Sequence, residues 1–256
     1  MRRALASVLA TVLALSAAAA NAAEIKVISA GAVRALIAGM IDDYSKETGH
    51  KFDFTTGPTG FLRDVIATGQ HADLIIASAP LMGELEKTGK LTTGSRNDLG
   101  RVGMGVVIRE GAPVPDVSTP EAIKQLLLKA SSIAYTDPKL GGTTVIHLMK
   151  LADRFGITDA VVKKGVLATG GDDASEKVAH GQAEIAVSLI SEIVPIKGAA
   201  LVGLLPAELQ SYLPFAAAVS AGSAAPEPAQ ALIKYLSAPD TREEWARGGF
   251  ELLGSK

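Results

Sequence analysis

The sequence contains no cysteine and only 4% aromatic residues. The absence of thiols excludes disulfide bonds, thiolate zinc sites, iron–sulfur clusters and a cysteine nucleophile. Basic and aromatic residues do not cluster, which argues against a nucleic-acid-binding surface. The 25 Lys and Arg nearly balance the 27 Asp and Glu, so no polyanionic partner is indicated. With 48% apolar and 20% charged residues, the 256-residue chain has the composition of a folded protein.

Beyond the N-terminus, no stretch approaches the ~20 consecutive apolar residues of a membrane span. The N-terminus has Arg2 and Arg3, an apolar run over 4–15 and the small-x-small triplet Ala20-Asn21-Ala22. This order is typical of a cleavable signal peptide over residues 1–22, with an N-terminal membrane anchor as the alternative. We therefore expect a periplasmic protein that diffuses freely as a monomer.

The remaining sequence alternates between strand and helix patterns. Apolar residues from Ile25 to Ile28 predict a strand, and those from Val33 to Tyr44 recur at helical spacing until Gly49. A strand followed by a helix with a closing glycine recurs over 51–69, 73–89 and 132–156. This alternation predicts an α/β fold with parallel-rich sheets flanked by helices.

The length of the chain suits two α/β lobes with a ligand cleft between them. We expect residues 23–102 and 214–256 to form lobe 1 and residues 103–213 to form lobe 2. The predicted crossings between the lobes are the extended segments 101–109 and 214–219, which should run side by side.

Several strand-to-helix junctions are rich in small and hydroxyl residues. They are Ser29–Arg34, Thr55–Gly60 and Thr136–Thr144, with Gly170–Asp173 as a fourth candidate. Ligands bind at the carboxyl ends of strands in open α/β sheets, and helix N-termini attract anions. The junctions therefore predict a small-anion site that includes Gly31, Thr56, Gly60, Gly142 and Thr144. Each junction alone also fits a purely structural turn.

Four charged or titratable residues lie near these junctions. Arg34 and Arg63 fall in or near first helical turns, where a bound carboxylate would offset their conflict with the helix dipole. His147 lies one turn after Thr143, and Glu192 follows a buried strand. Both are candidate bases, although their positions favour a structural histidine and a helix-start glutamate. No histidine pair has metal-ligand spacing, so we expect neither a metal nor a cofactor.

Five segments together resemble the molybdate-binding-protein family of periplasmic solute-binding proteins, the two-lobed type II class that serves ABC importers. They are ISAGAV, TTGPTGFLRDVIATGQHADLIIAS, YTDPKLGGTT, EIAVSLISEI and the tail from FAAAV to GGFELL. The resemblance implies that two lobes close on a ligand, with the membrane subunits of an importer as a possible partner. It adds Ser78, which ends the HADLIIAS segment, to the candidate ligand-binding residues.

The resemblance also implies which positions hold the ligand. Oxyanion-binding members use neutral donors at positions that fall on Ala32, Thr59, Thr143, Asp173 (or the next residue) and Leu189. Two of these positions, Ala32 and Leu189, lack the expected hydroxyl. Together with the nearby Arg34 and Arg63, this loss favours a carboxylate or another organic anion over molybdate. The segment ISEIVPIKGAALVGLLPAELQ resembles a branch of this family whose ligands are mostly unassigned and which is also similar to aconitate isomerase. Two functions therefore stay open, a binding protein for a small anion and an isomerase.

Overall fold

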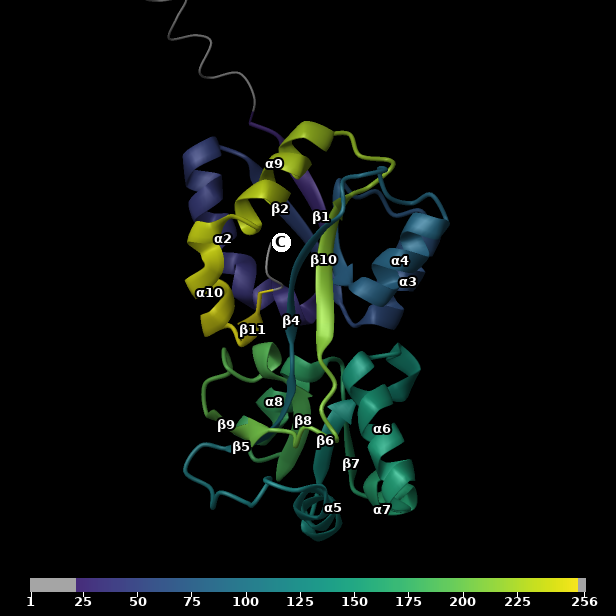
Figure 1. Ribbon diagram of the computed structural model, residues 1–256, viewed down its shortest axis with the longest axis vertical. Coiled ribbons are helices and arrows are strands. Elements are labelled where there is room, and N and C mark those ends of the chain that lie inside the picture. Colours follow the sequence, from purple (N-terminus) through teal and green to yellow (C-terminus); the bar gives the residue numbers. More distant parts are fainter. Residues whose placement is uncertain (1–21, 253–256) are drawn as a thin grey trace, which may run out of the picture.

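The computed structural model describes residues 22–252. The chain forms two β-sheets, each flanked by helices, arranged one above the other along the long axis (Figure 1). The predicted signal peptide of residues 1–22 lies outside the described residues except for its last position. Within residues 22–252, no helix has the length and apolar character needed to cross a membrane.

The first sheet has six strands and mixed pairing. In spatial order they are β11 (Phe250–Glu251), β4 (Asn97–Val102), β10 (Leu213–Val219), β3 (Leu74–Ser78), β1 (Glu24–Ala30) and β2 (Lys51–Gly57). Strand β1 pairs in parallel with β2 and β3, as the alternating pattern predicts. Strand β10 is antiparallel to both of its neighbours, because it enters this sheet from the opposite end.

Helices cover both sides of this sheet. On one side lie α2 (Gly31–Thr48) and α10 (Arg242–Arg247), and on the other lie α3 (Thr59–Ala67) and α4 (Ala79–Lys87); α9 (Pro226–Leu236) lies across the end (Figure 1). Helix α2 buries Val33, Ile37, Met40 and Tyr44 on one face, and Gly49 ends it in the left-handed conformation, as the spacing predicts.

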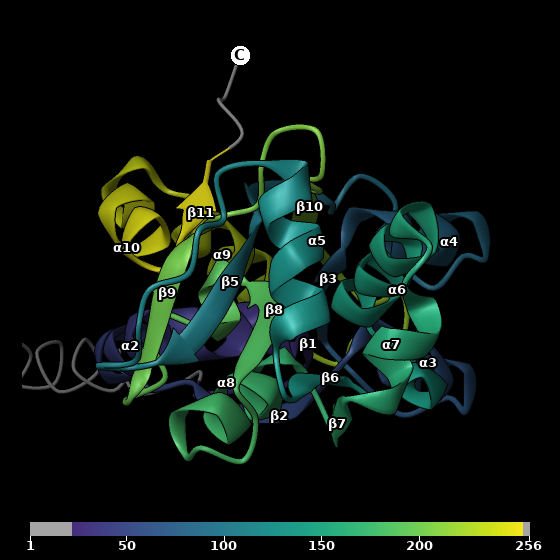
Figure 2. The same ribbon diagram turned by 90° about the horizontal axis from the view of Figure 1, so that it is seen from below.

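The second sheet has five strands. In spatial order they are β7 (Gly165–Ala168), β6 (Ile133–Thr136), β8 (Ile185–Leu189), β5 (Met104–Arg109) and β9 (Ala199–Leu204). Strand β6 is parallel to β7 and β8, whereas β5 is antiparallel to β8 and β9. The helices that flank the second sheet are α5 (Pro120–Lys129), α6 (Thr143–Phe155), α7 (Thr158–Lys163) and α8 (Gly171–Ala179). Figure 2 shows α6 and α7 on one side and α8 on the other.

The chain passes between the sheets twice. Strand β4 of the first sheet leads through Gly103 into β5 of the second, within the predicted crossing 101–109. The return runs through residues 205–212, so the predicted return crossing at 214–219 is wrong. Those residues pair with β3 and β4 inside the first sheet, since their almost continuously buried side chains suit a central strand covered on both faces.

The two passages lie side by side (Figure 1). Gln210 joins them, because its side-chain oxygen accepts from the Met104 amide at 2.8 Å and its side-chain nitrogen donates to the Met104 carbonyl at 2.9 Å. We propose that these passages form the hinge between two lobes, with lobe limits close to those expected from the sequence.

Candidate functional site

A cavity of about 380 Å³ lies between the two sheets and is lined by residues that follow both. The parallel strands point their carboxyl ends at it, since Ala30 ends β1, Thr136 ends β6 and Leu189 ends β8. This is the edge at which open α/β sheets bind ligands. The volume falls in the ~300–1,000 Å³ range of small-molecule sites.

Four helices begin at the cavity wall. Gly31 starts α2, Thr59 starts α3, Thr143 starts α6 and Gly171 starts α8. None of these four helix starts has a side-chain cap. Helix α5, away from the cavity, is capped by the Thr119 hydroxyl. The cavity is therefore surrounded by backbone N–H groups and the positive ends of four helix dipoles, an arrangement suited to an anion.

Neutral groups make up most of the wall. Six threonines contribute hydroxyls: Thr56, Thr59, Thr136, Thr143, Thr144 and Thr169. Apolar surface comes from Ala30, Ala32, Pro58, Phe61, Leu140, Leu189, Leu213 and Phe215. Of the described residues that line the cavity, none is Lys, Arg or His, and two are acids, Asp172 and Glu192. An anion bound here would be held by amides and hydroxyls.

Glu192 is held at the cavity wall by its neighbours. Its Oε2 atom accepts from the Ser188 hydroxyl at 3.0 Å and from the Leu189 amide at 3.4 Å. A side chain at Gly171 would collide with this carboxyl group, so the glycine permits its position. Burial raises the pKa of Glu192 to about 7; the Ser188 hydrogen bond lowers it, and the negative charge of Asp172 raises it.

The two halves touch beside the cavity. The hydroxyls of Thr59 and Thr143 share a hydrogen bond of 3.3 Å across the gap. Gly60 lies against the Leu140 carbonyl and the Gly141 Cα, and a Cβ at Gly60 would collide with that carbonyl oxygen. The sequence position of Gly60 predicts that it lines the cavity, and this prediction is wrong. Gly60 lies instead at the contact between the two halves that encloses the cavity.

The two arginines of the predicted site lie outside the cavity wall. The guanidinium of Arg34 stacks 4.0 Å from the centre of the Phe54 ring. Arg63 is exposed and pairs with Glu84, with 2.9 Å between Arg63 Nε and Glu84 Oε2. The prediction that these two arginines clamp a carboxylate in the cavity is wrong. Arg34 packs on Phe54 and Arg63 pairs with Glu84, and each partner lies in the same half of the molecule as its arginine.

Replacing Arg63 with alanine is expected to leave ligand affinity within about twofold of wild type, because the side chain lies outside the cavity wall. The lost ion pair is exposed and contributes at most ~1 kcal/mol to the free energy of unfolding. Calorimetric titration of the variant with a bound anion checks this, and a tenfold loss would mean that Arg63 reaches the ligand.

Three more predicted residues lie outside the wall. His147 directs its Nε2 to the Leu209 carbonyl at 2.7 Å, so it fixes the return passage rather than facing the cavity. Ser78 is buried at the end of β3. Asp173 turns back to accept from the Thr169 amide at 2.8 Å and pairs with Lys177. Burial raises the pKa of Asp173, but these donors outweigh it and keep that pKa below its usual range.

The remaining predicted residues do line the cavity. They are Gly31, Ala32, Thr56, Thr59, Gly142, Thr143, Thr144, Leu189 and Glu192. Sequence reasoning missed Phe61, Asp172, Leu213 and Phe215. Asp172 lies in the fourth candidate junction, Gly170–Asp173, although it is not among the ligand-binding residues predicted from the sequence. Phe215 reaches the cavity from β10, which the sequence predicts to be a crossing between the lobes. Within residues 22–252, no group of three or more His, Asp or Glu could hold a metal ion.

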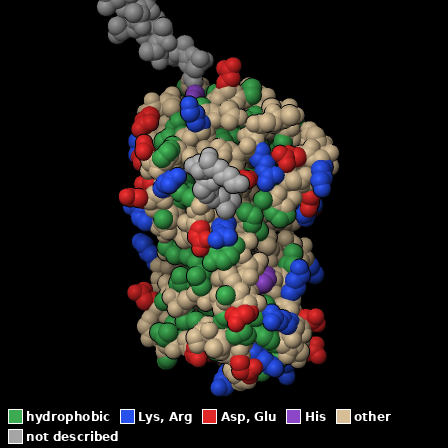
Figure 3. Space-filling view, in the orientation of Figure 1, with side chains coloured by type: hydrophobic (Ala, Val, Ile, Leu, Met, Phe, Trp, Pro, Cys, Tyr) green, Lys and Arg blue, Asp and Glu red, His purple; other side chains and the backbone are tan. Residues whose placement is uncertain are grey.

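The face seen in Figure 3 shows no second binding surface formed by charge. Basic and acidic side chains are scattered together over both ends, and hydrophobic side chains gather across the middle, where the two halves meet. That face has no broad area of one charge, so it offers no surface of the kind that binds a polyanion.

Comparison with known proteins decides the family. A family model described as bacterial extracellular solute-binding protein matches residues 25–251. This chain belongs to that family. An aconitate isomerase from Pseudomonas sp. is 30% identical to this solute-binding protein over 220 residues, which are 84% of this chain and 82% of the relative.

Molybdate-binding proteins of Azotobacter vinelandii are also similar to this solute-binding protein. The protein ModA is 29% identical over 244 residues, which are 93% of this chain and 94% of ModA. The structure of the periplasmic molybdate-binding protein from the same organism superimposes with a TM-score of 0.75 at 18% identity, covering 90% of this chain and all of the other. The predicted two-lobed α/β fold class and the family resemblance are thus confirmed.

Proposed function

We propose that this protein is a periplasmic solute-binding protein that delivers a small organic anion, bearing carboxylate groups, to the membrane subunits of an ABC importer. The observation that carries the proposal is the convergence of four uncapped helix starts on one cavity. Amides and dipoles of this kind stabilise negative charge without a basic side chain. The solute-binding family and its importer-associated members support the transport role.

The cavity wall favours a carboxylate over a metal oxyanion. Ala32 and Leu189 stand where the family resemblance implies hydroxyl donors, and both are apolar and buried. Phe61 and Phe215 add apolar surface beside the polar helix starts. A tetrahedral oxyanion presents oxygen in every direction and would leave some of it unpaired against this surface. An organic acid matches the wall with both carbon and carboxylate.

A thermal-shift panel tests the proposal. The panel contains trans-aconitate, cis-aconitate, citrate, molybdate, tungstate and sulfate, each at several concentrations. A ligand at 100 times its Kd adds ~2.7 kcal/mol to the protein's free energy of unfolding. The melting temperature of the protein then rises by several degrees. We expect carboxylates to raise the melting temperature and molybdate to leave it unchanged. A shift with molybdate alone would contradict the ligand class, and no shift with any anion would contradict the binding role.

A second function, isomerisation of an unsaturated tricarboxylate, is favoured by Glu192. It is an acid at the cavity wall of a chain that is 30% identical to an aconitate isomerase. As a carboxylate, Glu192 could take a proton from a methylene carbon next to a carboxylate. That electron pair would form the new double bond, and the pair of the old double bond would accept the proton at the far carbon.

Ultraviolet absorbance separates the two functions. An isomerase changes the absorbance of a trans-aconitate solution with time, and the Glu192→Gln variant should abolish the change. A binding protein gives a constant trace while calorimetry still detects the ligand. A constant trace with the wild-type protein would contradict the isomerase function.

A further inference from the structure

From the contacts of Glu192 we infer that it is a ligand-binding residue in its neutral form, donating a hydrogen bond from Oε1 to a carboxylate oxygen of the bound anion. This inference rests on the proposed anion-binding function. It adds a specificity-determining donor and predicts that the protein takes up a proton when the anion binds.

The hydrogen bonds from Ser188 and Leu189 leave one carboxyl oxygen of Glu192 for the ligand. Oε2 already accepts from the Ser188 hydroxyl and the Leu189 amide, whereas no described residue donates to Oε1. Glu192 lines the cavity among the helix starts that suit an anion. Oε1 is therefore the atom with which Glu192 can reach a ligand.

The neighbours of Glu192 allow a proton on either of its carboxyl oxygens. Ser188 has one hydroxyl proton, and both Glu192 Oε2 and the Gly171 carbonyl, 3.2 Å away, lie within its reach. With a proton on Oε2, Glu192 donates to Ser188, and Ser188 donates to Gly171. With the proton on Oε1, Oε2 accepts from Ser188 and Leu189 while Oε1 faces the ligand. Only the second arrangement leaves every group partnered when an anion is bound, because Oε1 then donates to the ligand and the Gly171 carbonyl still accepts from the Ser175 hydroxyl.

Within the described part of the chain, no cation pairs with Glu192. Arg34 of α2 lies over Phe54, as described above. On α8, Lys177 pairs with Asp173, and on α10, Arg247 pairs with Glu244. The charge that acts on Glu192 from α8 is the negative one of Asp172.

An anion in the cavity would add further negative charge beside Glu192. Two like charges in one desolvated site are strongly unfavourable, so ligand binding favours the neutral acid. A neutral acid also supplies a donor to a cavity that has no basic side chain among its described lining residues.

The experiment is calorimetric titration with trans-aconitate between pH 5.5 and 8.5, for the wild-type protein and the Glu192→Gln variant. Glutamine has the shape of the neutral acid and keeps a donor, but it cannot titrate. Because the free carboxyl has a pKa of about 7, wild-type Kd should weaken about tenfold from pH 6 to pH 8 relative to the variant. Taking this ratio removes the ligand's own titration from the result.

Two further measurements make the test independent of the variant. Titrations of the wild type in buffers of different ionisation enthalpy should show uptake of close to one proton per ligand at pH 8. The Asp172→Asn variant should keep the pH dependence but shift its midpoint to lower pH, because a negative charge next to Glu192 is gone.

The outcomes separate this inference from the proposed function. Parallel pH profiles of wild type and Glu192→Gln, with no proton uptake, would overturn the inference while the binding function stands. If neither trans-aconitate nor citrate binds at any pH, the proposed carboxylate function fails and the inference fails with it. A flat, tight profile for Glu192→Gln beside a sloping wild-type profile supports both.

Discussion

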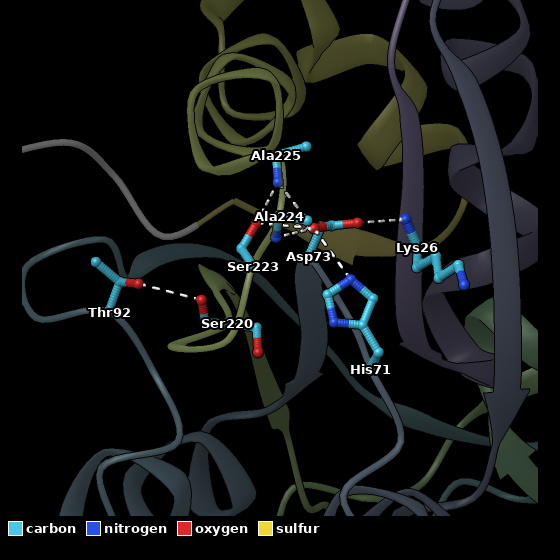
Figure 4. Close-up of polar contacts among 8 residues, drawn as sticks. All are labelled: Lys26, His71, Asp73, Thr92, Ser220, Ser223, Ala224 and Ala225. Carbon is cyan, nitrogen blue, oxygen red and sulfur yellow. Dashed lines mark hydrogen bonds and ion pairs between the residues drawn. The ribbon is translucent and has the colours of Figure 1, made fainter.

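Replacing Asp73 with alanine is expected to lower the free energy of unfolding by about 2–4 kcal/mol. Asp73 is 1% exposed and binds four donors, which Figure 4 shows converging from separate elements. Its Oδ1 accepts from the Ser223 hydroxyl and the Ala224 and Ala225 amides at 2.8–3.0 Å, and its Oδ2 accepts from the Lys26 amide at 2.9 Å. Alanine leaves the Lys26 and Ala224 amides without this acceptor, and the Ala225 amide at the start of α9 keeps only the Ser223 hydroxyl, 3.1 Å away.

Urea unfolding followed by circular dichroism measures this loss. The control is Asp43→Ala, which removes an exposed carboxylate paired with Lys46 and should change stability by no more than about 0.5 kcal/mol. Asp73→Asn should fall between them, because it keeps an acceptor for α9 but turns an NH₂ group toward the Lys26 amide. Equal stability of the Asp73→Ala and Asp43→Ala variants would contradict the role of Asp73.

The stabilisation by Asp73 should also depend on pH. Burial alone raises the pKa of Asp73, but the hydrogen bonds from Lys26, Ser223, Ala225 and Ala224 outweigh it and hold the pKa below its usual range. A lowered pKa gives stability that is present above the unfolded value of ~3.9 and lost as the pH falls through the folded value. The stability gap between wild type and Asp73→Asn should therefore shrink below about pH 4.

Replacing Gly60 with alanine is expected to weaken ligand binding about 10- to 100-fold. The new Cβ would collide with the Leu140 carbonyl oxygen, so α3 and the Leu140 segment could no longer meet beside the cavity. Steric overlap of this kind costs about 1–3 kcal/mol, and here that cost falls on the arrangement that encloses the ligand. Alanine suits a helix, so α3 itself should remain stable.

Calorimetric titration with trans-aconitate measures the affinity, and small-angle X-ray scattering measures closure. Gly39→Ala and Gly83→Ala are matched controls, since a Cβ at either position meets nothing within 4 Å. Wild type and controls should contract on adding ligand, whereas Gly60→Ala should contract less. Wild-type affinity in Gly60→Ala would show that the contact between Gly60 and Leu140 is not needed for binding.

The sequence predicted the elements whose apolar spacing is regular. Helix α2 follows from its buried face and Gly49, and α5 follows from Thr119, whose hydroxyl oxygen caps the helix by accepting from the Ala122 amide. The strand β4 was missed, because NDLGRV has no alternating pattern and gains its place by pairing with β10. The short β7 and α7 were missed too, since elements of four to six residues carry little periodicity.

The candidate site was predicted where it depends on backbone and missed where it depends on long side chains. Helix starts and glycines follow from local sequence, so Gly31, Thr59 and Thr143 were found at the cavity. An arginine side chain reaches a partner that spacing cannot reveal. Arg63 pairs with a glutamate 21 positions later, which no local pattern indicates.

A crystal structure of the protein grown with trans-aconitate tests the central claim most directly. We predict density for the anion between the two sheets, with its carboxylate oxygens within about 3.2 Å of first-turn amides from helices of both halves. Those amides belong to residues such as Ala32, Thr59, Thr144 and Asp172. Density outside this cavity, or an anion held by basic side chains, would contradict the account.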